Sequence, residues 1–233
     1  MSMMTEPLVL RSRDARGVIT LTLNRPQAFN SLSEELLAAL QTELDAIAAD
    51  DAARVVVLAA AGKAFCAGHD LKEMRADPSL GYYQRLFAQC GSVMLAVQRL
   101  PVPVIARVHG IATAAGCQLV AMCDLAVAAS GARFAVSGVN LGLFCSTPSV
   151  ALSRNLQRKA AFEMLVTGEF ISAEQALAKG LVNRVVPLDR LDARGARAQR
   201  QRQSGARLSM NACTPSSALA SIMLQAIVWP ASS

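Results

Sequence analysis

Apolar and polar side chains follow one another along this chain with the spacing of alternating strands and helices. Residues 18–23 set Val18, Thr20 and Thr22 against Ile19, Leu21 and Leu23, an alternation that predicts a half-buried strand. A first strand at 8–11 and a turn at 14–17 precede it. The apolar runs 54–60 and 104–108 are typical of strands buried on both faces of a parallel sheet.

Between these strands, apolar residues recur every three or four positions, as they do on one face of a helix. The segments predicted to be helical are 36–47, 82–99, a segment ending at 122, 148–155, 158–167 and 172–179. Capping-box patterns mark two helix starts, Ser31 with Glu34 and Ser172 with Gln175. With a further strand at 125–128, the alternation predicts an α/β fold with parallel strand pairing.

The chain of 233 residues suits one large domain, which we place at residues 1–189. Residues 190–233 differ in kind, because their first part has no apolar face and holds six arginines with one acidic residue. This atypical tail, expected to be partly disordered, carries five of the six net positive charges. The core domain is therefore nearly neutral, which argues against nucleic acid as a partner.

Several functional classes lack their sequence signals. No apolar run reaches the roughly 18–20 residues of a membrane span. Residues 1–7 show no leader pattern, so we expect a cytoplasmic protein. Six cysteines without C-x-x-C spacing and two histidines predict no metal site. Neither a dinucleotide-binding G-x-G-x-x-G nor a hydrolase G-x-S-x-G motif is present.

Three segments carry a specific resemblance. Leu23–Pro26 with Asn30–Leu32, then Lys63–Met74, then Val108–Leu125 resemble motifs of the enoyl-CoA hydratase/isomerase (crotonase) superfamily, in that family's order and spacing. The resemblance covers residues 8–189. It implies a crotonase-like spiral of ββα units, here with its C-terminal helical part missing or altered.

The resemblance also implies the chemistry of the site. The main-chain N–H groups of His69 and Ala115 would form an oxyanion hole for the enolate of an acyl-CoA thioester. Fixed amides at a helix N-terminus stabilise such a charge without reorganising. Coenzyme A would enter as part of the substrate, with no separate cofactor. The residues expected to contact it or the acyl group are Ala28, Ala67, Gly68, His69, Asp70, Leu71, Lys72, Gly116 and Cys145.

The chain departs from the family at the two glutamates that add water. Their positions fall on Gln118 and Gly138. An amide cannot exchange a proton in the required range, and glycine has no side chain. We therefore expect crotonyl-CoA hydration to be very slow or absent, and to rise when both positions become glutamate. The stretch Gly138–Pro148 resembles a branch of the family that lacks both glutamates as well.

Other interpretations stay open. One alternative is a non-catalytic acyl-CoA-binding or regulatory protein rather than a lyase or isomerase. The imidazole of His69 could act as a base, and Cys145 or Ser146 as nucleophile or acid rather than as a buried thiol and a helix cap. The family assembles as trimers or hexamers through C-terminal helices, which the basic tail does not resemble. A frameshifted C-terminus would explain the abrupt change in composition.

Overall fold

The structure, a computed structural model, describes residues 6–191. Its larger sheet has the strand order β1 (Val9–Arg13), β2 (Val18–Leu23), β3 (Val55–Ala60), β5 (Val104–Val108), β7 (Leu125–Ala129) and β10 (Arg184–Val186). β1 and β2 form an antiparallel hairpin, and all other neighbours are parallel. Parallel pairing of the apolar runs is thus confirmed. All but the first two residues of the predicted tail, 190–233, lie outside the described residues.

A smaller sheet has the order β4 (Ala64–Cys66), β6 (Ile111–Thr113), β8 (Arg133–Ala135) and β9 (Ile171–Ser172). Its first three members each follow a strand of the larger sheet along the chain, as β4 follows β3. Each turn of the chain therefore adds one strand to each sheet, and a helix closes the turn. The polypeptide winds as a spiral of ββα units.

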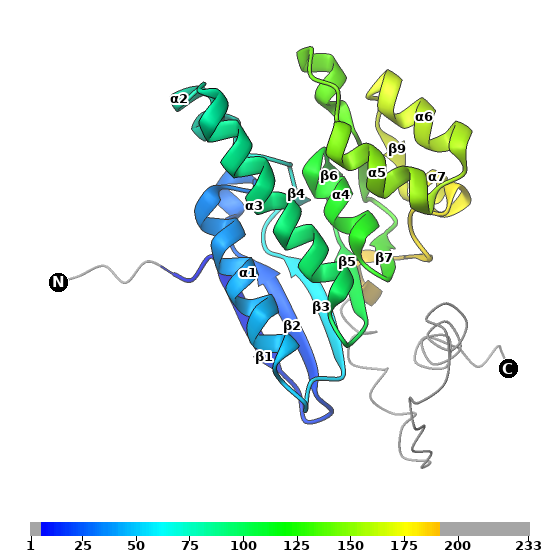
Figure 1. Cartoon of the computed structure of the whole chain (residues 1–233). Helices are drawn as coiled ribbons and strands as arrows, with labels where there is room; N and C mark the ends of the chain where they lie inside the picture. The colour runs from blue at the N-terminus through cyan, green and yellow to red at the C-terminus, as the bar shows by residue number, and fades with distance from the viewer. Residues whose placement is uncertain (1–5, 192–233) are drawn as a thin grey trace, which may run out of the picture. The chain divides into compact units, whose positions relative to one another are not determined.

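Helices cover the sheets. α1 (Glu34–Ala48) and α3 (Leu80–Arg99) run side by side over one face of the larger sheet (Figure 1). The short α2 (Leu71–Ala76) precedes α3. α4 (Ala115–Met122) packs on α5 (Ser146–Asn155), which contacts α6 (Arg158–Thr167), and α7 (Ala173–Lys179) follows β9. Two 3-10 turns complete the set, η1 (Pro26–Ala28) and η2 (Ser137–Leu141).

One of the two predicted capping boxes is confirmed. The Gln175 N–H donates to Ser172 Oγ at 3.2 Å, and the Ser172 N–H donates to Gln175 Oε1 at 2.8 Å. The other prediction is wrong, because α1 is capped by Ser33, whose Oγ accepts from the Leu36 N–H at 3.2 Å. Ser31 accepts instead from the Arg25 guanidinium at 2.9 Å, so it ties the turn before the helix.

Candidate functional site

The turn into α4 presents one free amide. Ala114, the residue before the helix, has the left-handed angles φ 50° and ψ −122°. Its own N–H donates to the Ala135 carbonyl at 3.0 Å. Ala115 is the first residue of the helix, where an N–H has no acceptor within the helix itself. Among the described residues, the Ala115 N–H has no acceptor elsewhere either.

The loop after β4 presents a second free amide. His69 forms an isolated parallel bridge with Leu32, in which the Gly68 carbonyl accepts from the Leu32 N–H at 2.7 Å. The Asp70 N–H donates back to the Leu32 carbonyl at 3.3 Å. In such a bridge, Leu32 is bonded to the residues on either side of His69, and the N–H and C=O of His69 itself point away from Leu32. The His69 N–H accordingly finds no acceptor within residues 6–191.

These two segments lie against each other. A β-carbon added at Gly68, which has φ +90°, would stand 3.4 Å from the Ala115 nitrogen and 2.9 Å from the Ala114 β-carbon. One added at Gly116 would meet the Cys66 carbonyl oxygen at 2.2 Å. The parallel pairing of β4 with β6 continues the same contact. The structure thus brings together Gly68, His69, Ala115 and Gly116, four of the predicted site residues.

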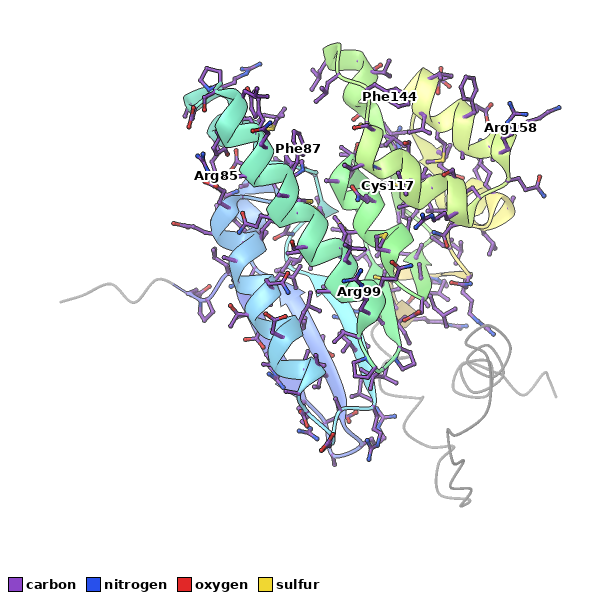
Figure 2. The ribbon with its side chains drawn as sticks, viewed as in Figure 1. Arg85, Phe87, Arg99, Cys117, Phe144 and Arg158 are labelled. Carbon is purple, nitrogen blue, oxygen red and sulfur yellow. The ribbon has the colours of Figure 1, made fainter. Side chains whose placement is uncertain are left out.

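Two buried polar side chains accompany the amides. The His69 ring packs edge-on against Phe87 of α3 at 5.2 Å between centroids, and Figure 2 labels Phe87 on that helix. Burial lowers the pKa of His69 to about 4, against the effect of a hydrogen bond with the Leu32 main chain, so the ring is neutral at pH 7. Gln118 is 6% exposed. Within the described chain, the buried Oε1 of Gln118 has no hydrogen-bond partner.

Asp70 has a structural role, because its carboxylate caps α2 and pairs with Arg25. One carboxylate oxygen caps α2 by accepting from the Lys72 N–H at 2.9 Å, and the other lies 2.6 Å from Arg25 Nη1. Burial alone would raise its pKa, but the hydrogen bonds from Arg25 and Lys72 outweigh burial and hold the pKa below its ordinary value. Leu71 and Lys72 are exposed on the first turn of α2. Arg25 belongs to the first sequence motif, but sequence reasoning gave it no role in the site, because its partner lies 45 positions away.

Ala28 lies close to the loop after β4, because the next residue, Phe29, is hydrogen-bonded to that loop. The Ala67 N–H donates to the carbonyl of Phe29 at 3.1 Å, which ties the end of η1 to the loop after β4. Ala28 and Ala67 are both half-buried. The first and second sequence motifs therefore meet in the structure.

The surroundings of Gly138 are closed by its own loop. A β-carbon added at Gly138, in η2, would stand 2.5 Å from both Cys145 Sγ and the Leu143 carbonyl oxygen. Burial raises the pKa of the Cys145 thiol, which disfavours the thiolate that a nucleophile requires. Sequence reasoning missed a hydroxyl pair nearby, since Thr113 Oγ1 and Ser137 Oγ lie 2.9 Å apart. No motif or spacing signals that contact.

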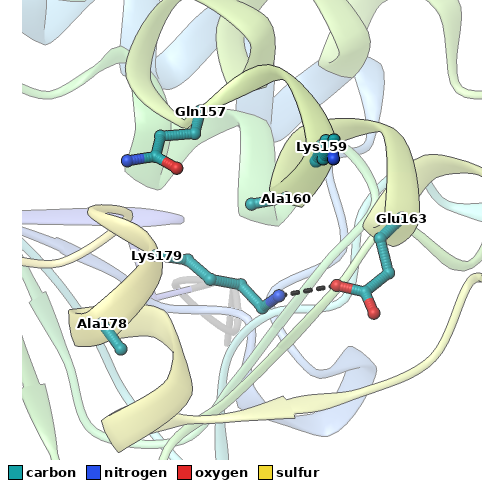
Figure 3. Close-up of a pocket in the computed structure, with 6 residues that line it drawn as sticks. All are labelled: Gln157, Lys159, Ala160, Glu163, Ala178 and Lys179. Carbon is teal, nitrogen blue, oxygen red and sulfur yellow. Dashed lines mark hydrogen bonds and ion pairs between the residues drawn. The ribbon is translucent and has the colours of Figure 1, made fainter.

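A hollow between α6 and α7 lies apart from these residues. Gln157, Ala160 and Ala178 line it with the ion pair of Lys179 and Glu163, 2.6 Å between Nζ and Oε2 (Figure 3). It includes none of the predicted site residues. Within residues 6–191, no helix has the length and hydrophobicity to cross a membrane, and no cluster of three or more metal-ligating side chains occurs.

Comparison with known proteins identifies the family. The enoyl-CoA hydratase/isomerase family matches residues 13–220, so the chain belongs to that family. The match continues past residue 189, where we expected the resemblance to end. Family membership and the spiral topology together confirm the predicted crotonase-like fold.

Particular relatives support the predicted branch. Enoyl-CoA hydratase domain-containing protein 3 from Xenopus laevis is 50% identical over 185 residues, covering 79% of this chain and 63% of that protein. The Homo sapiens protein of that name is 46% identical over 183 residues, covering 78% and 60%. The chain thus spans less than two thirds of the length of these relatives. The stretch Gly138–Pro148 predicts membership of the enoyl-CoA hydratase domain-containing protein 3 branch, and these relatives carry that name.

Solved structures of similar proteins support the same family assignment. An enoyl-CoA hydratase from Mycobacterium smegmatis is similar with 72% identity and a TM-score of 0.81, over 82% of this chain and 74% of that one. The human enoyl-CoA hydratase domain-containing protein 3 has 45% identity and a TM-score of 0.78, over 82% and 75%.

The predicted cytoplasmic location is contradicted by these relatives. The frog, rat and human proteins are all named as mitochondrial, which points to mitochondria rather than to the cytoplasm. The prediction rested on the composition of residues 1–7 alone. A short terminal stretch is a weak basis for a location, because targeting segments are removed or lie outside the folded domain.

Proposed function

We propose that this chain binds acyl-CoA thioesters and polarises the thioester carbonyl with the main-chain N–H groups of His69 and Ala115. The observation that carries the proposal is the contact between the two segments that present these amides, each without an acceptor among the described residues. Two donors aimed at one carbonyl oxygen stabilise the negative charge that the oxygen gains in an enolate. Removing one such donor typically slows a reaction by about 10²–10³-fold.

The same proposal assigns little or no hydration to the protein. Gln118 lies one helical turn after Ala115 and cannot take a proton from water at neutral pH. Gly138 offers no acid, and its surroundings leave no room for a side chain. Each missing proton-transfer group typically costs about 10²–10⁴-fold in rate. His69 does not replace them well, because its burial leaves it a weak base.

Coenzyme A enters as part of the substrate in this proposal, with no further cofactor. Ala28, Ala67 and Leu71 border the loop after β4 and are accessible to a ligand there. Lys72 is exposed beside them and would meet the phosphates. Gly68 and Gly116 contribute close approach of main chain, and Cys145 lines the side where Gly138 lies.

A second candidate is a non-catalytic acyl-CoA binder that uses the same site. The closed environment of Gly138 favours it, because the loop has no space for an acid. The two candidates share the amide pair and differ only in turnover.

One matched pair of ligands tests the shared claim. Butyryl-CoA and its thioether analogue, S-butyl-CoA, differ only in the carbonyl oxygen. Calorimetry should show butyryl-CoA binding about tenfold tighter or more, because two hydrogen bonds contribute about 0.5–1.5 kcal/mol each. Equal affinities would contradict the role of the amides. Turnover of a panel of acyl-CoA thioesters then separates the enzyme from the binder.

Assembly as homotrimers or hexamers also remains a prediction. Phe162 and Val166 on α6 and Leu177 on α7 are exposed, which supports self-association through apolar contact. Light scattering of the purified full chain measures the mass directly, and a monomer at micromolar concentration would contradict the prediction.

A further inference from the structure

The direction of the His69 N–H is set by the peptide plane that it shares with the Gly68 carbonyl. In a trans peptide the carbonyl and the N–H point in opposite directions. The Gly68 carbonyl accepts from the Leu32 N–H at 2.7 Å, so the His69 N–H points away from Leu32. The position of Leu32 therefore determines where this amide donates.

Gly68 restrains that peptide plane less than any other residue would. Its φ of +90° lies in a region that glycine enters freely, and glycine can turn away from it at little cost. The second hydrogen bond of the bridge, from the Asp70 N–H to the Leu32 carbonyl, is longer at 3.3 Å. Holding the His69 N–H in one direction therefore requires a further contact between the two segments.

One guanidinium nitrogen of Arg25 supplies that contact. On the segment of His69, Arg25 Nη1 donates to Asp70 Oδ2 at 2.6 Å. On the segment of Leu32, the same nitrogen donates to Ser31 Oγ at 2.9 Å and to the Ser31 carbonyl at 3.2 Å. Both acceptors belong to direct chain neighbours of the bridged residues. Arg25 thus fastens the bridge from both sides.

The contact is strong because it is charged and largely shielded from water. The side chains of Arg25 and Asp70 are 22% and 9% exposed. Hydrogen bonds between ionised groups are stronger than neutral ones, and salt screens a partly buried pair less than an exposed one. The main chain of Arg25 is also fixed, since its N–H donates to Asn30 Oδ1 at 2.8 Å. Asn30 is fully buried and donates in turn to the carbonyls of Ala61 and Ala64, both at 2.8 Å.

We propose that Arg25 is a positioning residue, whose contacts with Ser31 and Asp70 hold the His69 N–H in the direction that the thioester oxygen requires. This inference rests on the proposed function and adds to it a residue that acts through the main chain of another. A hydrogen bond weakens steeply when its donor is misaligned. Loss of the Arg25 contacts should therefore weaken the recognition of the carbonyl oxygen in particular.

The test compares two ligands on four proteins. Butyryl-CoA and S-butyl-CoA are titrated by calorimetry into the wild type, Arg25→Gln, Asp70→Asn and Arg13→Gln. Asparagine is a good helix cap, so Asp70→Asn retains the cap of α2 while removing the charge that Arg25 pairs with. Arg13→Gln is the matched control, because Arg13 makes an exposed ion pair, 3.1 Å between its Nη1 and Asp50 Oδ2. Arg13 pairs with Ile19 near the start of β2, whereas Arg25 follows the end of that strand.

We expect the wild type and Arg13→Gln to prefer butyryl-CoA by about tenfold or more. In Arg25→Gln and Asp70→Asn the preference should fall to about threefold or less, because one of the two donors is no longer aimed at the oxygen. Urea denaturation shows whether each variant is folded, and Asp70→Asn decides the outcome if Arg25→Gln does not fold. A folded Arg25→Gln or Asp70→Asn that keeps the full preference would overturn the inference and leave the proposed function standing. Equal affinities of the wild type for the two ligands would overturn both.

Discussion

Two regions of this chain, the turn at the start of α4 and the segment from Gly138 to Cys145, are built differently. At the start of α4, the turn Ala114–Gly116 is enclosed by main chain, and a β-carbon at Gly116 would lie 2.2 Å from the Cys66 carbonyl oxygen. The segment from Gly138 to Cys145 folds back on itself, with the Leu143 carbonyl and Cys145 Sγ beside Gly138. Three of its apolar side chains are more than half exposed: Leu141 at 67%, Leu143 at 52% and Phe144 at 54%.

The difference shows how firmly the rest of the fold holds each region. Strand β6 leads into the first region and pairs with β4 on one side and β8 on the other, so the geometry of the turn is set by the sheet. In the second region, the Cys145 thiol and the Leu143 carbonyl leave no room for a side chain at Gly138. We expect Gln118→Glu together with Gly138→Glu to restore hydration only if the loop carrying Leu143 and Cys145 moves to make room for the new side chain.

The largest effect we expect is at Gly116. Gly116→Ala should lower the free energy of unfolding by about 3 kcal/mol or more, because the added methyl meets main chain that cannot move freely. Urea denaturation measures the change. Gly91→Ala is the matched control in α3, where no described atom lies within 4 Å of the added carbon. It should be stabilising by about 0.5–1 kcal/mol, and a similar loss in both variants would contradict this account.

A smaller effect is expected at Gly138. Gly138→Ala should cost about 1–2 kcal/mol, since the added carbon meets Cys145 Sγ and the Leu143 carbonyl in a more adaptable segment. Cys145→Ala removes one of the two obstacles. The double variant should therefore be less destabilised than the sum of the single variants, as a double-mutant cycle will show. Strict additivity would mean that the two side chains do not meet.

Lowering the pH tests the burial of His69, which lies in the loop that contacts the start of α4. The folded-state pKa of about 4 lies below the ordinary 6.5, so the unfolded chain takes up the proton first as the pH falls. Stability is lost between about pH 6.5 and 4 and is fully present above that window. From pH 7 to pH 5, the wild type should lose about 1–2 kcal/mol more than His69→Phe.

Paired urea titrations at the two pH values supply that measurement. Asp124, whose pKa burial raises, stays in both proteins, and its contribution cancels in the difference. Parallel losses in wild type and variant would show that the imidazole is not buried in the folded protein.

The smallest effect concerns strain in the turn itself. Ala114 has φ 50°, a conformation that costs a residue with a β-carbon energy that glycine avoids. Ala114→Gly should therefore raise the free energy of unfolding by about 1 kcal/mol. Calorimetric melting temperatures provide the readout, and a lower melting temperature would argue against the left-handed conformation.

Much of the fold followed from periodicity. The strand 18–23 and the helix 158–167 were predicted with their observed bounds, because their patterns are long enough to show a period. Strands β4, β6 and β8 were missed, since three residues cannot display an alternation. The helix start at Ser33 was misplaced because Ser31 offers the same local signal two residues earlier.

The candidate site was predicted through a family resemblance, and the structure adds what spacing alone cannot. His69 and Ala115 are 46 positions apart, and only the pairing of β4 with β6 brings their segments into contact. The closure of Gly138 by Cys145 and Leu143 depends on how a loop folds back on itself. Neither contact has a sequence signal of its own.

A crystal structure of the full chain with bound S-butyryl-CoA tests the central claim most directly. We predict that the thioester oxygen lies about 2.7–3.1 Å from both the His69 and the Ala115 main-chain nitrogens. A thioester oxygen that contacts only one of these nitrogens, or neither, would contradict the account.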